Sequence, residues 1–209
     1  KQYNKNKDRG YAKDFVDLID QSMDIIISKN IKIITNAGGV NPYRCAEEIK
    51  KRTTDKIKIA VIEGDNIIDK INEYIDLGVS FNNTDNGKSI KEIKDSICSA
   101  NIYIDSFVVA EALKNQPHIV LGGRITDPGL IVGPCIYEFG WKKEEYQKLA
   151  AATVAGHIVE CGAQCTGGNY SRWWENDDFI NIGYPIISID ENGLFDVYKD
   201  NNTGGLVNK

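Results

Sequence analysis

Apolar residues follow two different patterns along the first part of the chain. Over residues 11–28 they recur at spacings of three and four, which predicts one amphipathic helix. Short β-branched runs, too brief to form helices, predict buried strands instead. These runs cover residues 31–35, 57–62 and 118–121.

A polar turn and then a helical pattern follow each predicted strand. The helical patterns cover residues 42–52, 67–78 and 128–138. Because parallel strands need a crossover connection, successive strand-to-helix steps indicate parallel pairing. The sequence therefore predicts an α/β fold with a mainly parallel sheet flanked by helices.

Short polar residues mark where two of these helices begin. Asn41 precedes Pro42, which suits a first helical turn, so Asn41 is expected to cap the helix. Asp105 or Ser106 is expected to cap a further short helix over residues 107–113, which follows an extended segment.

The chain changes character after about residue 165. A long helix is expected over residues 144–161, with one stripe that includes Tyr146, Val154 and His157. A hairpin-like pattern follows over residues 186–197. We therefore expect an α/β domain over residues 1–165 and a partly antiparallel C-terminal segment over residues 166–209, which continues beyond the given chain.

Composition narrows the class of protein. The 209 residues are 42% apolar and 26% charged, as in a folded globular chain. A formal net charge of -5 provides no basic surface for nucleic acid. The longest apolar-leaning stretch, residues 149–159, is too short to cross a membrane. No secretion signal is visible and the five cysteines are scattered, so reduced thiols and a cytoplasmic location are expected.

Polar and glycine residues follow the predicted strands, where ligands bind in parallel α/β folds. Glycine turns let backbone N–H groups approach an anion, and Arg124 adds a donor for a carboxylate or phosphate. Tight turns need glycine in any case, and Arg124 can instead pair with Asp127. The candidate substrate-binding residues are Asn36, Gly38, Gly39, Asp65, Asn101, Gly123 and Arg124.

A second set of candidates lies at the end of the long predicted helix. His157 and Glu160 share a helical face, and an imidazole beside a carboxylate suits proton transfer. Cys161 is a candidate nucleophile, and Asp127 completes the candidate catalytic set. The alternative is that His157 is an interior residue and Cys161 a small core side chain.

The same helical face has residue types that bind metals. A metal site is not expected, because no second histidine motif is present and Cys161 and Cys165 have CxxxC spacing rather than the zinc CxxC spacing. No strand is followed by a dinucleotide glycine pattern, which disfavours a nicotinamide dehydrogenase. The sequence identifies no cofactor.

Eight motifs in order resemble the acyclic terpene utilisation family. The resemblance covers nearly the whole chain. The motifs are Thr35-Asn36-Ala37-Gly38-Gly39-Val40-Asn41-Pro42, Glu63-Gly64-Asp65, Ser99-Ala100-Asn101, Gly123-Arg124 with Thr126-Asp127, Gly156-His157 with Glu160-Cys161-Gly162-Ala163-Gln164, Thr166-Gly167-Gly168, Gly183-Tyr184-Pro185 and Thr203-Gly204-Gly205.

The resemblance implies catabolism of acyclic isoprenoids through CoA esters, and it implies that this chain is the internal portion of a longer protein. The family's acidic pair after Glu63-Gly64 is reduced here to Asp65-Asn66. This chain therefore lacks the second carboxylate of that pair. Surface left exposed by absent segments would favour association, so a homo-oligomer is among the expectations.

Two functions are consistent with these residues. The first is an enzyme that acts on a small carboxylate or acyl-CoA by hydratase-like or lyase-like chemistry. The second is a non-catalytic binding or assembly subunit, associated with a biotin-dependent acyl-CoA carboxylase. Clustering of Arg124, Asp127, His157 and Glu160 around one cleft would favour the enzyme, and their dispersal would favour the subunit.

Overall fold

The protein is built on a three-stranded parallel sheet. The computed structural model describes residue 3, residues 6–53 and residues 57–208. Its strands β1 (Ile33–Thr35), β2 (Ile59–Ile62) and β3 (Ile119–Gly122) have the order β1-β3-β2. Val120 in the central strand pairs with Ile34 on one side and Ala60 on the other, in parallel register.

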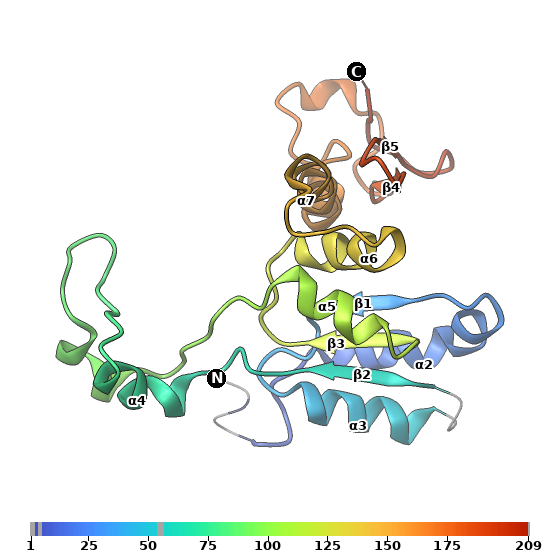
Figure 1. The fold of residues 1–209 in the computed structure, drawn as a ribbon. Coiled ribbons are helices and arrows are strands. Elements are labelled where there is room, and N and C mark those ends of the chain that lie inside the picture. The colour runs from blue at the N-terminus through green and yellow to red at the C-terminus, as the bar shows by residue number, and fades with distance from the viewer. Residues whose placement is uncertain (1–2, 4–5, 54–56, 209) are drawn as a thin grey trace.

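Helices cover both faces of this sheet (Figure 1). Ile119 and Leu121 of β3 pack with residues of α2 (Lys13–Ser28) and α3 (Pro42–Arg52). Val120 packs with Val109 and Leu113 of α5 (Ser106–Leu113). Alternate side chains of β3 thus serve the two layers, and every residue of β3 is buried. The predicted mainly parallel sheet flanked by helices is confirmed.

Two further helices follow α5, and the first of them also contacts β1. Helix α6 (Gly129–Phe139) packs on α5, and α7 (Tyr146–Cys161) packs on α6 (Figure 1). The range expected for α7 is close to that observed. The stripe of residues expected on this helix, however, is not the face that is buried. Tyr146 is 72% exposed and Val154 is 53% exposed. The buried residues are instead the small ones, Ala152, Ala155 and Gly156, because α6 approaches closely there.

An arm between β2 and α5 extends away from the sheet (Figure 1). It contains a short 3-10 turn (Ile68–Lys70) followed by α4 (Ile71–Asp76), so the predicted helix over residues 67–78 is shorter than expected. Further 3-10 turns, Ile90–Glu92 and Lys94–Ser96, follow before the chain returns to the sheet.

Of the two predicted helix caps, one is present in the structure and one is not. The Asp105 Oδ1 atom accepts hydrogen bonds from Phe107 N at 2.8 Å and Val108 N at 3.2 Å, so this cap is confirmed. The prediction for Asn41 is wrong, because its side chain makes no cap bond to α3. Its amide donates instead to the carbonyl oxygens of Lys7 and Arg9, which ties the N-terminal segment to the loop after β1.

The C-terminal segment contains the predicted antiparallel hairpin. Strand β4 (Ile186–Ile189) pairs with β5 (Phe195–Tyr198). Glycine motifs from separate parts of the segment also meet. The buried Thr166 hydroxyl donates to Gly183 O, and Leu206 N donates to Thr166 O at 2.7 Å. These contacts give the C-terminal glycine motifs a packing role.

Candidate functional site

The loops after all three parallel strands meet at the carboxyl edge of the sheet and form a pocket of about 200 Å³. We call it the sheet-edge pocket. Six of the seven predicted substrate-binding residues line it, and Val40 is the one lining residue outside that prediction. The lining residues are Asn36, Gly39, Val40, Asp65, Asn101, Gly123 and Arg124.

Asp65 is the buried polar residue of the sheet-edge pocket, with 5% of its surface exposed. Its Oδ2 atom accepts a hydrogen bond from Asn101 Nδ2 at 2.9 Å and another from Arg124 N at 3.0 Å. Its Oδ1 atom accepts none from the residues that the structure describes. The carboxylate therefore fixes two loops through one oxygen, while the other has no hydrogen-bond partner among the described residues.

Glycines allow these loops to approach one another. A Cβ atom on Gly123 would lie 2.6 Å from Gly39 O and 2.7 Å from Asp65 Oδ2. Gly39 has a φ of +55°, and a Cβ atom there would overlap the Gly10 carbonyl oxygen. Both positions thus require glycine for steric reasons, whether or not a ligand is present.

Gly38 is the predicted binding residue that does not line the sheet-edge pocket. It is buried behind the pocket, where a Cβ atom would lie 2.6 Å from Pro42 Cβ and 2.7 Å from Gly122 O. Gly38 therefore lets the loop after β1 pack against the end of β3.

Arg124 has an exposed side chain that forms no ion pair with a carboxylate of the described residues. Its guanidinium carbon lies 5.4 Å from the ring centre of Tyr103. Its carbonyl oxygen accepts a 3.0 Å hydrogen bond from Ile104 N, which joins its loop to the extended segment before α5. Arg124 and Asp127, both described residues, form no ion pair, so the structure does not support the alternative that they pair.

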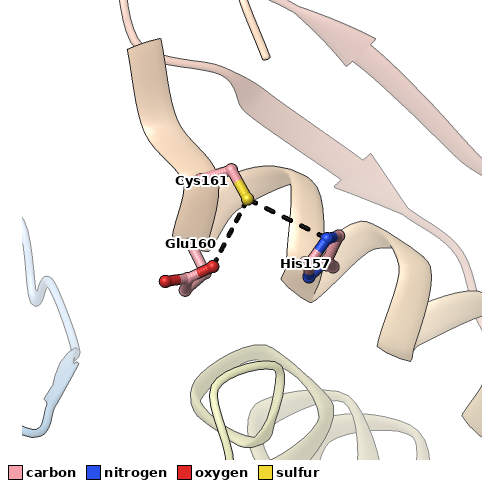
Figure 2. Close-up of side chains that lie close together, drawn as sticks. All are labelled: His157, Glu160 and Cys161. Atoms are coloured by element: carbon pink, nitrogen blue, oxygen red, sulfur yellow. Dashed lines mark hydrogen bonds between the residues drawn. The ribbon is translucent and has the colours of Figure 1, made fainter. Parts of the chain in front are cut away.

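His157, Glu160 and Cys161 come together at the C-terminal end of α7 (Figure 2), and we call them the reactive cluster. One potential ligand atom from each lies within 4.8 Å of the others. The Cys161 sulfur lies 3.9 Å from His157 Nε2 and donates to Glu160 Oε2 at 3.4 Å. Their i, i+3 and i+4 spacing places them on one helical face.

The three residues of the reactive cluster differ in their exposure to solvent. His157 and Glu160 are exposed and Cys161 is half-buried, so the alternative that His157 is an interior residue is wrong. The hydrogen bond to Glu160 raises the pKa of the Cys161 thiol, and Cys165 contributes to the same shift. A raised thiol pKa disfavours Cys161 as a nucleophile, because the thiolate is the reactive form.

Asp127 belongs to neither group. It is exposed and precedes Pro128, the N-cap residue of α6. A Cβ atom on Gly156 would lie 2.8 Å from Pro128 O, so α7 contacts the start of α6 next to His157. Arg124, Asp127, His157 and Glu160 are therefore not gathered around one cleft. One short loop leads from the sheet-edge pocket to the start of α6, which Gly156 of α7 contacts.

Sequence reasoning missed Val40 and Tyr103. Val40 directly follows the two glycines of the first loop, and Tyr103 lies two residues after Asn101 in the extended segment. Both residues lie close in sequence to predicted site residues, and this proximity could have identified them. Their contribution depends on how the loops fold together, which local patterns do not show.

The fold and the pocket define an α/β protein with a candidate ligand site at the carboxyl edge of a parallel sheet. The family model described as acyclic terpene utilisation family protein AtuA matches residues 1–209, so the chain belongs to that family, as its motifs predict. Membership indicates a role in the utilisation of acyclic terpenes. No curated protein and no solved structure matches the chain. None of the described helices combines the length and apolar character needed to cross a bilayer.

Proposed function

We propose that the protein is an enzyme of acyclic isoprenoid catabolism that takes a small isoprenoid carboxylate or its CoA thioester. The proposed chemistry is of the hydratase or lyase type. One observation carries the proposal: loops from three strands converge on a pocket that combines an exposed arginine with a buried, oriented carboxylate. Convergent polar groups of this kind are typical of ligand sites.

The size of the sheet-edge pocket limits what enters it. About 200 Å³ is below the usual range of roughly 300–1,000 Å³ for whole ligands, so the pocket suits a polar head group. Apolar side chains lie exposed at and next to it: Val40 is 42% exposed, Ile102 45% and Tyr103 61%. An isoprenoid chain outside the pocket would find apolar contacts there.

The charges in the sheet-edge pocket assign separate roles to its groups. The Arg124 guanidinium would hold the carboxylate or polarise the thioester carbonyl. The free Oδ1 atom of Asp65 would accept a hydrogen bond from a substrate hydroxyl. Both groups suit a hydroxy acid or its thioester, which is the hydrated partner in a hydration and dehydration pair.

For a substrate that extends from the sheet-edge pocket along the loop that ends at Pro128, His157 and Glu160 would move the protons of this reaction, although they do not line the pocket itself. In dehydration a base takes the proton from the carbon next to the carbonyl, the carbon–oxygen bond breaks, and the hydroxyl leaves with an added proton as water. An imidazole and a carboxylate on one helical face provide a base and an acid. Contact between Gly156 and Pro128 connects their helix to the loop that also holds Arg124.

Binding measurements test the proposal. Calorimetric titration of the full chain with branched isoprenoid acids and their CoA thioesters should show binding that Arg124→Ala weakens by about tenfold or more, because one charge-assisted contact is lost. Arg172→Ala is the matched control, since Arg172 is an exposed arginine paired with Glu175 in the C-terminal segment. His157→Ala should abolish turnover and retain binding. Equal binding in both arginine variants would contradict the proposal.

A second function, that of an assembly subunit beside an acyl-CoA carboxylase, is favoured by two observations. The four predicted site groups named above do not line one pocket, and apolar residues are exposed in the C-terminal segment. Trp173 and Trp174 are each 63% exposed, Tyr184 is 71% exposed and Ile180 is 101% exposed. Large exposed apolar groups often mark interfaces. Co-purification with a biotin-containing carboxylase that is lost on Trp173→Ala and Trp174→Ala, without ligand binding by the chain alone, would support this function instead.

A further inference from the structure

The geometry of the reactive cluster points to a binding site for one thiophilic divalent metal ion, zinc above all. His157 offers an imidazole nitrogen, Glu160 a carboxylate oxygen and Cys161 a sulfur, all within 4.8 Å of one another. Within the described residues 3, 6–53 and 57–208, no other group of three such side chains meets this condition.

The distances suit a single ion. With Zn–S at about 2.3 Å and Zn–N at about 2.0–2.1 Å, two ligand atoms of a tetrahedral site lie about 3.6 Å apart. The Cys161 sulfur lies 3.9 Å from His157 Nε2 and 3.4 Å from Glu160 Oε2. The remaining pair, His157 and Glu160, lies within the wider limit of 4.8 Å, so an ion among these atoms would draw the imidazole and the carboxylate closer together.

The position on α7 also favours a cation. The three residues lie on one face of the last turns of a 16-residue helix, so the backbone holds them without any loop movement (Figure 2). Carbonyl groups at the C-terminal end of a helix carry partial negative charge, which favours positive ions there. Exposure of His157 and Glu160 leaves the ion a path from solvent.

The ligand set indicates which metal would bind and what position it would leave open. A thiolate with an imidazole selects zinc and similar ions over magnesium and calcium, which prefer oxygen ligands. Ion binding would replace the thiol proton of Cys161, which leaves to solvent. Three protein ligands leave a fourth position to water or substrate, as in catalytic zinc sites. The sequence spacing disfavours zinc because spacing motifs describe the order of ligands along the chain. They do not describe where the ligand atoms lie in the folded protein.

This inference does not depend on the proposed function, because metal binding is measured without substrate. In the loaded protein, His157 and Glu160 would be ligands, so the proton-transfer roles proposed above apply to the chain without metal, and the ion would instead polarise groups bound beside it. If the chain binds no metal, the proposed binding of isoprenoid acids through Arg124 is still tested separately by calorimetry. If it binds no isoprenoid acid, the metal site is not contradicted.

Cobalt provides the test, because a thiolate bound to Co²⁺ gives a charge-transfer band in the near ultraviolet. The full chain, reduced and freed of metal with a chelator, is titrated with Co²⁺ and then with Zn²⁺. We expect a band that saturates at one Co²⁺ per chain and disappears on addition of Zn²⁺. Cys161→Ser should remove the band, and His157→Ala should weaken Co²⁺ binding by more than about tenfold.

Controls separate this site from binding to other thiols. Cys98→Ser is the matched variant, since Cys98 is an exposed cysteine on the arm, and it should keep the band. Circular dichroism of each variant checks that the chain is folded. Absence of the band in the folded wild-type chain would overturn the inference. So would a band that survives His157→Ala at full affinity but is lost in Cys165→Ser, because the two thiols of Cys161 and Cys165 would then hold the ion.

Discussion

Asp65 and Asn101 join the two sides of the sheet-edge pocket. The Asn101 amide donates to Asp65 Oδ2 at 2.9 Å, although the residues lie 36 positions apart and the whole arm separates them. Asp65 O also accepts a 2.8 Å hydrogen bond from Ile102 N, so side chain and backbone fix the same two loops. The ends of the arm are thus closed at the candidate ligand site, and the arm can extend from the sheet without opening the pocket.

Asp65→Ala is therefore expected to lower the free energy of unfolding by about 1–3 kcal/mol, because it removes the charged acceptor of the hydrogen bonds from Asn101 Nδ2 and Arg124 N. Asn101→Ala removes one of the two donors and should cost less. Urea denaturation measures both. Glu73→Ala, at an exposed position of the arm, is the control and should stay within about 0.5 kcal/mol of wild type. A loss for Asp65→Ala no larger than that of the control would contradict the role assigned to this carboxylate.

Substitution of Gly123 is expected to damage the pocket more than the fold. An alanine Cβ atom would lie 2.6 Å from Gly39 O and 2.8 Å from Asp65 Oδ1, so the loop after β3 would have to move away from the loop after β1. We expect Gly123→Ala to cost about 1–3 kcal/mol, as overpacking does, and to abolish ligand binding in calorimetry. Gly87→Ala, on the arm, is strained by its φ of +70° but has nothing near its Cβ position, so it should cost some stability and retain binding.

Local patterns were sufficient to predict most of the fold. The continuous apolar run that becomes β3 is buried on both faces, and a strand with that pattern suits only the centre of a covered sheet. The stripe expected on α7 failed for a physical reason. Helices α6 and α7 lie so close together that the small residues Ala155 and Gly156 are the buried ones. A pattern of large apolar residues does not predict where two helix backbones come close.

The candidate site could be predicted less completely. Strand ends in a parallel sheet share an edge, so the gathering of Asn36, Asp65 and Arg124 follows from the predicted topology. Helical spacing likewise brings His157 and Cys161 together. The relation between these two groups could not be predicted, because it depends on how α7 packs against the start of α6 at Pro128.

The Glu160 carboxylate disfavours deprotonation of the Cys161 thiol. The thiol donates to the Glu160 carboxylate, and the negative charge there raises the pKa of Cys161 because it disfavours the thiolate. Glu160→Gln removes the charge, so the pKa should fall. The rate of iodoacetamide alkylation at Cys161, followed against pH by mass spectrometry, should reach half its maximum at a lower pH in the variant. An unchanged or higher midpoint would show that the carboxylate does not act on this thiol.

Reactivity of the remaining thiols should follow their burial. Cys45 and Cys135 lie in the core, where burial raises the pKa of Cys45 to about 12 and that of Cys135 to about 11. Both are therefore protonated and shielded at neutral pH, whereas Cys98 and Cys165 are exposed. A native alkylation time course should label Cys98 and Cys165 first. Cys45 and Cys135 should react only after urea unfolds the chain, since reaction requires opening of the helix layers that cover them. Rapid labelling of Cys45 under native conditions would contradict the packing of α3 against the sheet.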